Sequence, residues 1–300
     1  MAITAALDTL MDFRFAYLRA IAYSWTLWKP GQPVEEQDRF IRRLLSGENI
    51  LPLLQGSVKD GPGFGMRCGW PDFAVCLAYD PKPSWEKPAT GWRSVPPFGW
   101  VGVDDQFIIT LPQKPRPVSD GGLAVLALAD YYKRWPTIMG QDDADHGEVK
   151  GMGIPGAAAG GGQDALLEFG SVVLRAIALA WQDPVFLSAL TAPDLPDAST
   201  VLSQYLGYNN PFNFQITFST DGSLTWGPDG NGGGTWDYQG PSSGGLTQSK
   251  PNAVLLRYPA PPMQYPRPDH PPTLDKSVWP FALASYNNTG PAYPFTCMGG

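Results

Sequence analysis

Apolar residues near the start of the chain recur at a helical spacing. The spacing predicts one helix over residues 4–28, which Pro30 and Gly31 end. Its two apolar faces carry, respectively, Phe13, Tyr17, Ile21 and Trp25, and Met11, Phe15, Leu18 and Ala22. A helix that is apolar on most sides is expected to be buried on most sides.

The pattern then predicts two short helical segments, two strands and a closing helix in the first half of the chain. The helical segments cover 35–45 and 49–54, the strands cover 72–79 and 107–111, and the closing helix runs from Ser119 or Asp120 to about Arg134. In the first strand, Val75 and Leu77 alternate with Cys76. A loop rich in proline and glycine joins the two strands and contains Trp85, Trp92 and Trp100.

The second half repeats this order of elements. Its predicted helices cover 165–181, a segment that Asp183 and Pro184 begin, and a segment that Asp197 caps and Gly207 ends. Its predicted strands cover 211–218, a return at 223–226 after a hairpin turn at Asp221-Gly222, and 253–258. Trp226 and Trp236 flank a glycine-rich loop between them.

Two stretches of sequence occur twice, in nearly one register. Leu18–Trp25 returns as Leu174–Trp181 at an offset of 156 (174 − 18). Ala127–Tyr131 returns as Ala282–Tyr286 at an offset of 155 (282 − 127). The strands align as well, because Ile108-Ile109 matches Leu255-Leu256 and Pro112 matches Pro259, both at an offset of 147 (259 − 112). These matches predict a tandem duplication of a unit too long for a solenoid repeat.

The duplication divides the chain into three parts. Residues 1–140 are the first repeat domain, 141–162 a linker rich in glycine and alanine, and 163–300 the second repeat domain with a C-terminal tail. Each domain is predicted to hold N-terminal helices, an antiparallel sheet with a loop rich in Trp, Pro and Gly, and a closing helix. Because helices and strands come in runs without βαβ alternation, the fold class is α+β.

The chain carries few charges and many aromatic side chains. Its 300 residues are 43% hydrophobic and 16% charged, with 11 Trp, 12 Tyr and 14 Phe and a net charge of −7. The negative charge and the absence of a basic cluster argue against a nucleic-acid partner. The aromatic residues favour surfaces that bury against another subunit, and therefore self-association as a homo-oligomer or filament.

Nothing in the sequence indicates a membrane or secretory segment. No apolar run approaches the length that a transmembrane helix needs. Residues 1–13 have no basic residue, and Asp8 and Asp12 interrupt their apolar run, so they lack the features of a signal peptide. We expect synthesis in the cytoplasm, and export by a route without a signal peptide stays open.

No group of polar residues has the spacing of a catalytic or metal site. His146 and His270 have no second ligand at a metal-binding spacing, and the chain has no paired acid and base. We therefore expect no enzyme activity, no metal and no cofactor. The remaining candidates are expected to be structural. We expect buried or half-buried thiols at Cys68 and Cys76, and ordinary loops at the glycine-rich segments 61–65 and 230–234. We expect solvated carboxylates at Asp104, Asp105, Asp142, Asp143 and Asp145, and packed indoles at Trp85, Trp92, Trp100, Trp226 and Trp236.

Two stretches of the second half resemble a known family. The run from Leu174 to Leu190, LRAIALAWQDPVFLSAL, resembles the leader region of nitrile-hydratase-like ribosomal peptide precursors. The tail from Ala282 to Cys297, ALASYNNTGPAYPFTC, is similar to the ends of thiazole/oxazole-modified microcin (TOMM) precursors, a bacteriocin family. Nitrile hydratase activity is not implied, because the chain lacks the C-x-x-C-S-C cluster of that enzyme's metal site.

The resemblance implies a substrate and not a catalyst. In that family a leader helix recruits a cyclodehydratase-type enzyme, which converts Cys, Ser or Thr near the C-terminus into azoles. Carried to this chain, the candidates are Cys297 first, and then Thr296, Thr289 and Ser285. The tail holds one Cys, and a spectator thiol or an intersubunit contact at Cys297 stay open as alternatives.

Two functional hypotheses from different classes follow. The first is a non-catalytic, TOMM-type precursor that a modifying enzyme converts near Cys297. The second is a self-assembling structural subunit of a filament or tube. Two similar domains in one chain place similar surfaces at both ends, which favours open head-to-tail contacts.

Overall fold

A computed structural model describes the helices and strands and many of their connections. The described residues are 2–56, 62–66, 73–79, 84–86, 99–101, 105–117, 120–134, 162–195, 197–210, 215–220, 223–230, 233–239, 252–263 and 273–288. Residues 141–161 of the predicted linker 141–162 lie outside these residues, together with Asp142, Asp143, Asp145 and His146 in that segment. Cys68, Trp92, Asp104, His270 and residues 289–300 of the C-terminal tail also lie outside them.

The first helix, α1, spans Ala2–Leu27, as its apolar spacing predicts. One face is buried, and it carries Phe13, Ala16, Tyr17, Ala20, Ile21, Ser24 and Trp25. The prediction that the opposite face is also buried is wrong at Phe15, which is 61% exposed. The guanidinium of Arg19 lies 5.2 Å from the centre of the Phe15 ring, so a charged neighbour covers part of it.

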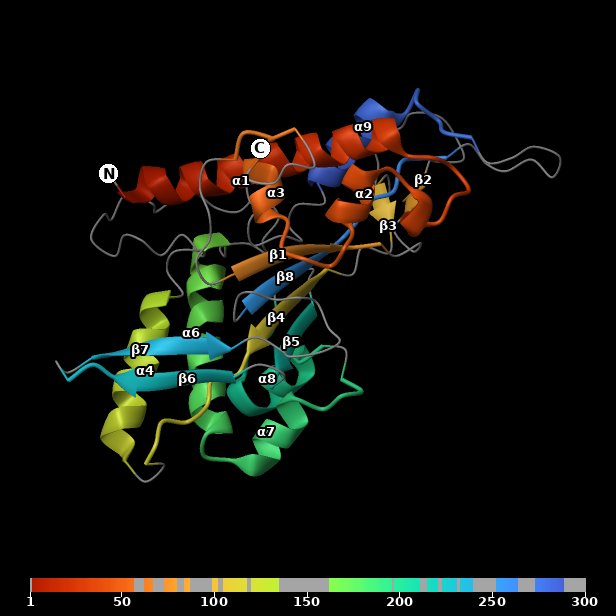
Figure 1. Ribbon diagram of the computed structural model, residues 1–300. Coiled ribbons are helices and arrows are strands. Elements are labelled where there is room, and N and C mark those ends of the chain that lie inside the picture. Colours follow the sequence, from red (N-terminus) through yellow and green to blue (C-terminus); the bar gives the residue numbers. More distant parts are fainter. Residues whose placement is uncertain are drawn as a thin grey trace.

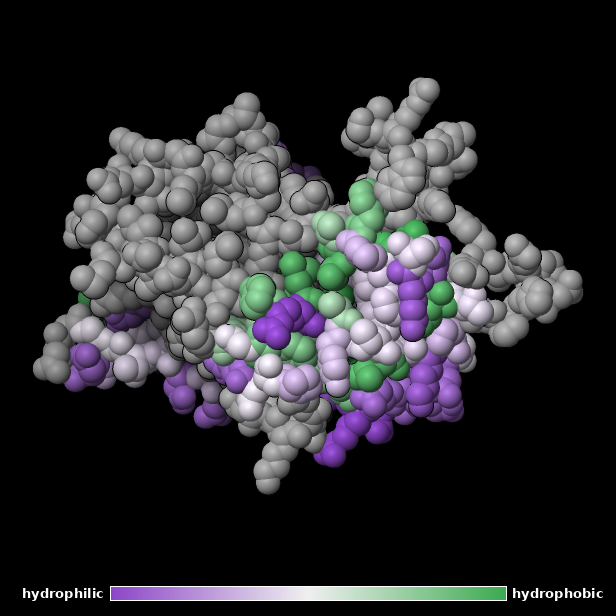
Figure 2. Space-filling model, turned by 90° about the horizontal axis from the view of Figure 1, so that it is seen from above, coloured by the Kyte–Doolittle hydropathy of each residue, from purple (hydrophilic) through white to green (hydrophobic). Residues whose placement is uncertain are grey.

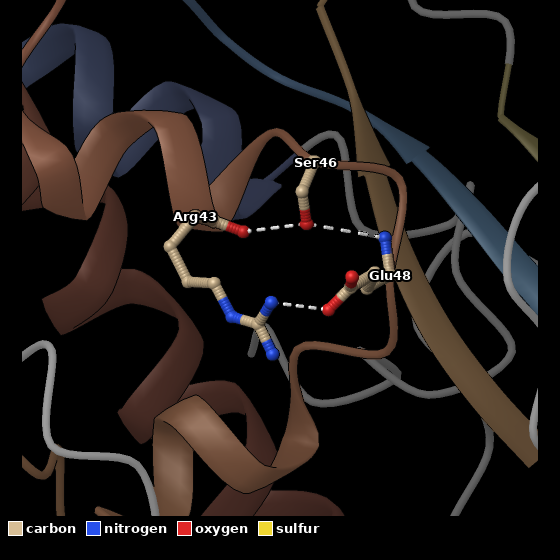
Figure 3. A network of polar contacts seen from close by, with 3 residues as sticks. All are labelled: Arg43, Ser46 and Glu48. Atoms are coloured by element: carbon tan, nitrogen blue, oxygen red, sulfur yellow. Dashed lines mark hydrogen bonds and ion pairs between the residues drawn. The ribbon is translucent and has the colours of Figure 1, made fainter.

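Three short helical segments follow α1: the 3-10 helix η1 (Val34–Glu36), α2 (Arg39–Leu44) and α3 (Leu51–Gln55). η1 and α2 replace the single amphipathic helix predicted over 35–45, because the Asp38 carboxylate caps a new helix by accepting from the Phe40 N–H. α3 lies close to the segment predicted at 49–54. In the turn after α2, the Ser46 hydroxyl donates to the Arg43 carbonyl, and the Arg43 guanidinium pairs with Glu48 (Figure 3). This turn leads directly to the start of α3.

The other helices and most of the strands lie close to their predicted positions. The helices are α4 (Gly121–Arg134), α6 (Gly162–Ala180), α7 (Pro184–Leu190), α8 (Ser199–Leu206) and α9 (Trp279–Asn288). The strands are β1 (Phe73–Ala78), β2 (Ser84–Glu86), β3 (Gly99–Val101), β4 (Gln106–Thr110), β5 (Gln215–Ser219), β6 (Ser223–Pro228), β7 (Gly234–Gln239) and β8 (Asn252–Arg257). The strands β2, β3 and β7 were not predicted, because their residues were assigned to the Trp-rich and glycine-rich loops. The predicted caps Asp120 and Asp183 both accept backbone N–H groups at the starts of their helices. Helices and mixed sheets together make the fold α+β.

Four of the strands form one mixed sheet in the order β1-β8-β4-β5. The middle pair, β8 and β4, is antiparallel, whereas β1 is parallel to β8 and β5 is parallel to β4. The prediction of an antiparallel sheet in each half is therefore wrong for this sheet. Sequence periodicity reports which residues are buried in a strand, but it carries no information about which strand lies beside it.

The remaining strands form two antiparallel hairpins, β2–β3 and β6–β7. The hairpin predicted to join β5 and β6 across Asp221-Gly222 is wrong, because β5 pairs with β4 and β6 pairs with β7. The predicted glycine-rich loop at 230–234 falls between β6 and β7 in the sequence; Gly234 is the first residue of β7, and residues 231 and 232 lie outside the described residues. Trp226 and Trp236 lie opposite each other in that hairpin and are each 8% exposed, so they are packed as predicted.

The helices gather in two groups beside the two outer pairs of the sheet (Figure 1). In that view α1, α2, α3 and α9 lie toward β1 and β8, and α4, α6, α7 and α8 lie toward β4 and β5. One continuous apolar core joins both groups to the same face of the sheet, through Val75 on β1, Phe107 on β4, Ile216 on β5 and Val254 on β8. Ala74, Cys76, Ala253 and Leu255 form a second, smaller cluster.

Candidate functional site

The candidate site follows from the four residues that the sequence singles out for modification. Cys297, Thr296 and Thr289 lie outside the described residues. Ser285 is one residue from the buried Tyr286 in α9, whose described span ends at Asn288. The geometry that the structure describes is therefore that of α9, the helix that precedes the three later candidates in the sequence.

A pair of tyrosine hydroxyls fixes α9 to α1. The hydroxyls of Tyr17 and Tyr286 lie 2.7 Å apart in a buried hydrogen bond, and the Tyr286 hydroxyl also donates to the Arg257 carbonyl at 3.4 Å. The two side chains are 2% and 1% exposed. Since a buried hydroxyl without a partner costs about 1–3 kcal/mol, this pairing holds α9 in one position on α1.

Burial keeps these hydroxyls protonated. The pKa of Tyr17 lies well above its usual value because burial removes water from around the phenolate, and Tyr286 raises it further. Burial also raises the pKa of Tyr258, whose hydroxyl lies 2.8 Å from the Ser24 hydroxyl on α1. The hydroxyls at the α1–α9 contact are thus buried and hydrogen-bonded to one another or to backbone, which suits a structural anchor.

The N-terminal end of α9 is held by aromatic packing. The ring centre of Trp279 lies 5.8 Å from that of Trp25 on α1, and the Lys276 ammonium lies 5.6 Å from the Trp279 ring. Val278 and Ala282 are buried on the same side. Together with the tyrosine pair, these contacts immobilise the helix over its first two turns.

The helical backbone decides what Ser285 can do. Heterocycle formation at Ser285 would join its Oγ to the carbonyl carbon of Ala284 and would remove the Ala284 carbonyl oxygen and the Ser285 N–H. An α-helix uses both groups, since each N–H bonds to the carbonyl four residues earlier. Modification at this position would therefore break α9 beside its buried anchor.

The other residues that the sequence singles out are structural where the structure describes them. Cys76 is fully buried, and burial raises the pKa of its thiol to about 12, so it is not a nucleophile near neutral pH. Asp105 is not a solvated carboxylate as predicted: it is 1% exposed, and its Oδ1 accepts the Arg257 N–H at 2.7 Å. Within the described ranges no three His, Cys, Asp or Glu side chains gather as metal ligands would.

Sequence reasoning missed the partners of Tyr17 and Asp105. Tyr17 was placed on the correct buried face, but its contact with Tyr286 joins positions 269 residues apart. The sequence feature that pointed to Tyr286 was its position at the end of the repeated stretch Ala282–Tyr286. That repeat indicates a buried face of the helix, but it does not indicate which residues pack on that face.

The match with a known family falls on this part of the molecule. Residues 164–294 match the model of a family described as a ribosomal natural product, two-chain TOMM family. The resemblance to TOMM precursors is thereby confirmed for the second half, from α6 to the residues beyond α9. A family of ribosomal natural products consists of precursors, which is the role that the TOMM match suggests here.

Two further comparisons add nothing to the TOMM match. Neither the curated proteins nor the solved structures contain a match to this chain. Among the described helices, none combines the length and the apolar character required to span a bilayer.

Proposed function

We propose that this protein is a non-catalytic, folded precursor of the TOMM type, in which the residues after α9 are the substrate of a cyclodehydratase-type enzyme. The observation that supports the proposal is the anchoring of α9 by Tyr17 and Tyr286, since Thr289, Thr296 and Cys297 follow this helix in the sequence. The family match over residues 164–294 supports the same role. The chain is made in the cytoplasm, where the enzyme would meet it before any export.

The proposed reaction at Cys297 closes a ring on the preceding residue. The Cys297 sulfur attacks the carbonyl carbon of Thr296, and the carbonyl oxygen leaves as water, which gives a thiazoline. A two-electron oxidant held by a partner enzyme then removes two hydrogens to give the thiazole. Thr296 and Thr289 would react in the same way through their hydroxyls, whereas the helix disfavours reaction at Ser285.

Under this proposal the folded body presents the tail and does not react. Its buried Tyr17, Tyr258 and Cys76 have raised pKa values and are shielded from solvent. The stretch that resembles a leader lies in α6 and α7, which pack against each other and against α8 and offer a preformed surface for the enzyme. A rigid docking surface and a reactive tail are the two features that such a substrate needs.

Co-expression with a TOMM-type cyclodehydratase and dehydrogenase tests the proposal. The intact mass should fall by one water and two hydrogens for each azole, and fragmentation should place the loss between Thr289 and Cys297. Cys297→Ala should remove the loss at that site, and Ser285→Ala should leave the mass change as it is in the parent chain. An unchanged mass in the presence of active enzymes would rule out the substrate role.

We further propose that residues 1–140 and 163–300 are two copies of one module, joined by 141–162. Two equivalent sets of hydrogen bonds support the duplication. Asn49 Oδ1 accepts the N–H groups of Leu51 and Val75, and Asp197 Oδ1 accepts those of Ser199 and Ile216. Asn49 and Asp197 differ by 148 (197 − 49), close to the sequence offsets, and each ties the start of a helix to an outer strand of the sheet.

Self-assembly into a filament or tube is the second candidate function. Large apolar side chains are exposed on equivalent helices: Leu126 on α4 is 37% exposed and Phe281 on α9 is 40% exposed, at an offset of 155 (281 − 126). Figure 2 shows hydrophobic residues, in green, among hydrophilic ones, in purple, on one face of the molecule. Light scattering and negative-stain imaging test this role; a monomer at high concentration would rule it out.

A further inference from the structure

The four-stranded sheet draws neighbouring strands from different halves of the chain. β1 and β4 belong to residues 1–140, and β8 and β5 belong to residues 163–300, yet the order is β1-β8-β4-β5. Every strand in this sheet therefore has its hydrogen-bonded neighbour, or both neighbours, in the other half. Neither half pairs two strands of its own in this sheet.

The middle of the sheet has the geometry of a twofold contact. Phe107 on β4 pairs with Val254 on β8. At the offset of 147 (254 − 107), Val254 is also the residue of the second half that corresponds to Phe107, so the pair joins equivalent positions. Contacts on either side are reciprocal: Asp105 Oδ1 accepts the Arg257 N–H, and Asn252 Oδ1 accepts the Thr110 N–H. Asp105 corresponds to Asn252 and Thr110 to Arg257 at the same offset, as in an isologous interface between two identical subunits.

The closing helices are exchanged as well. The first-half helix α4 contacts α6 and β7 of the second half, and the second-half helix α9 contacts α1 and β3 of the first half. On the α4 side, the indole nitrogens of Trp226 and Trp236 donate to the Asp130 carboxylate and the Ala127 carbonyl, at 3.0 and 3.1 Å. Each half thus completes the core of the other.

The outer strands of the sheet are covered from within their own halves. At β1 the Ile50 N–H donates to the Val75 carbonyl at 2.8 Å, and at β5 the Ala198 N–H donates to the Ile216 carbonyl at 2.7 Å. Covered edges do not recruit further strands. Strand pairing between modules is therefore directed to the β4–β8 contact.

We infer that the two halves are a pair of interaction partners carried on one polypeptide, and that their association does not require the segment 141–162. Each half binds the other, which is a similar module, through the β4–β8 strand pairing and through α4 and α9, each of which packs on the opposite half. The matched family is described as two-chain, and its model spans a single half of this chain. The inference rests on these contacts and not on the proposed modification.

Cutting the full-length chain inside the linker tests this inference. A protease site inserted between Ala159 and Gly160 allows the folded protein to be nicked, and the product is then examined by size-exclusion chromatography with mass detection. We expect both fragments to elute together at the mass of the intact chain, with an unchanged circular dichroism spectrum. Separation into two folded fragments, or loss of the folded spectrum on cutting, would overturn the inference.

A matched pair of variants makes the test specific to the interface. Trp181→Phe removes the 2.7 Å hydrogen bond that the second-half indole donates to the first-half Pro112 carbonyl. In the nicked protein it should raise the dissociation constant of the fragments by about tenfold, the effect expected for one part-buried hydrogen bond across the interface. Val185→Ala, at a side chain that is 69% exposed on α7, is the control and should leave the constant unchanged. An equal effect of both variants would contradict the assigned interface.

Discussion

The indole nitrogen of Trp181, at the end of α6, donates a 2.7 Å hydrogen bond to the carbonyl oxygen of Pro112, just after β4. The counterpart of Trp181 in the first half is Trp25, and its indole nitrogen donates to the Pro259 carbonyl, just after β8, at 2.7 Å. Each bond crosses from one half to the other. The most similar stretches of the two halves therefore make the same contact, with the donor and acceptor halves interchanged.

Replacing either tryptophan should destabilise the protein by a similar amount. Trp25→Phe and Trp181→Phe each leave a carbonyl without its donor while keeping an aromatic ring, so each should lower the free energy of unfolding by about 1–3 kcal/mol. The measurement is urea unfolding followed by circular dichroism. Because the two sites share no partner, the double variant should lose the sum of the two. A near-neutral effect at both sites would show that these bonds do not hold the halves together.

Asp105 should act as a hydrogen-bond acceptor whose charge is dispensable. Its counterpart Asn252 accepts the Thr110 N–H with a neutral amide oxygen, so Asp105→Asn should keep the acceptor for the Arg257 N–H. We expect Asp105→Asn to change the free energy of unfolding by less than about 1 kcal/mol and Asp105→Leu to lower it by about 1–3 kcal/mol. Equal losses in both variants, measured by urea unfolding, would show that the negative charge itself is required.

Alkaline pH should destabilise the fold through the buried tyrosines. The pKa of Tyr17 is raised in the folded state, so above the ordinary tyrosine pKa of 10.0 the unfolded chain loses a proton that the folded chain keeps. Stability from this group is complete below that value and is lost as the pH rises toward the folded pKa. Tyr258 acts in the same direction, and so does Cys76 above the ordinary thiol value of 9.0. The free energy of unfolding should fall by about 1 kcal/mol per pH unit and per tyrosine above pH 10.

Tyr17→Phe is the control for this pH dependence. The variant loses the hydrogen bond to Tyr286 and should be less stable at neutral pH, but its stability should fall less steeply above pH 10 than that of the parent chain. The comparison therefore uses the slope and not the absolute stability. Equal slopes in the two proteins would show that Tyr17 ionises as readily when folded as when unfolded.

Most of the elements could be predicted from local pattern, because their signals lie within a few residues. The four-residue spacing of Phe13, Tyr17, Ile21 and Trp25 gives α1, and the Asp183-Pro184 pair gives the start of α7. The alternation around Cys76 gives β1 with both faces buried. These features depend on backbone geometry and capping, which the neighbouring residues determine.

The pairing of the strands could not be predicted in the same way. β1 and β8 lie side by side although about half the chain separates them, and the burial of Leu77 is the same whichever strand is its neighbour. The burial of Asp105 was missed for a related reason. Its acceptor role exists only once Arg257 of the other half is beside it, so its sequence neighbours suggested solvent.

At the candidate site, the resemblance to TOMM precursors supplied the residues, in the order Cys297, Thr296, Thr289 and Ser285. Ser285 and Thr289 both entered as hydroxyl residues near the C-terminus. The position of Ser285 in α9, next to the anchored Tyr286, separates it from Thr289, Thr296 and Cys297. The distinction depends on the helical backbone, which a list of reactive residue types does not contain.

The fragmentation mass spectrum of the C-terminal peptide, taken from protein isolated from cells that make it together with its modifying enzymes, tests the central claim most directly. The account predicts that Cys297 has lost one water and two hydrogens with its preceding carbonyl, and that Ser285 is intact. An unaltered peptide, or an azole at Ser285 in protein that still folds, would contradict it.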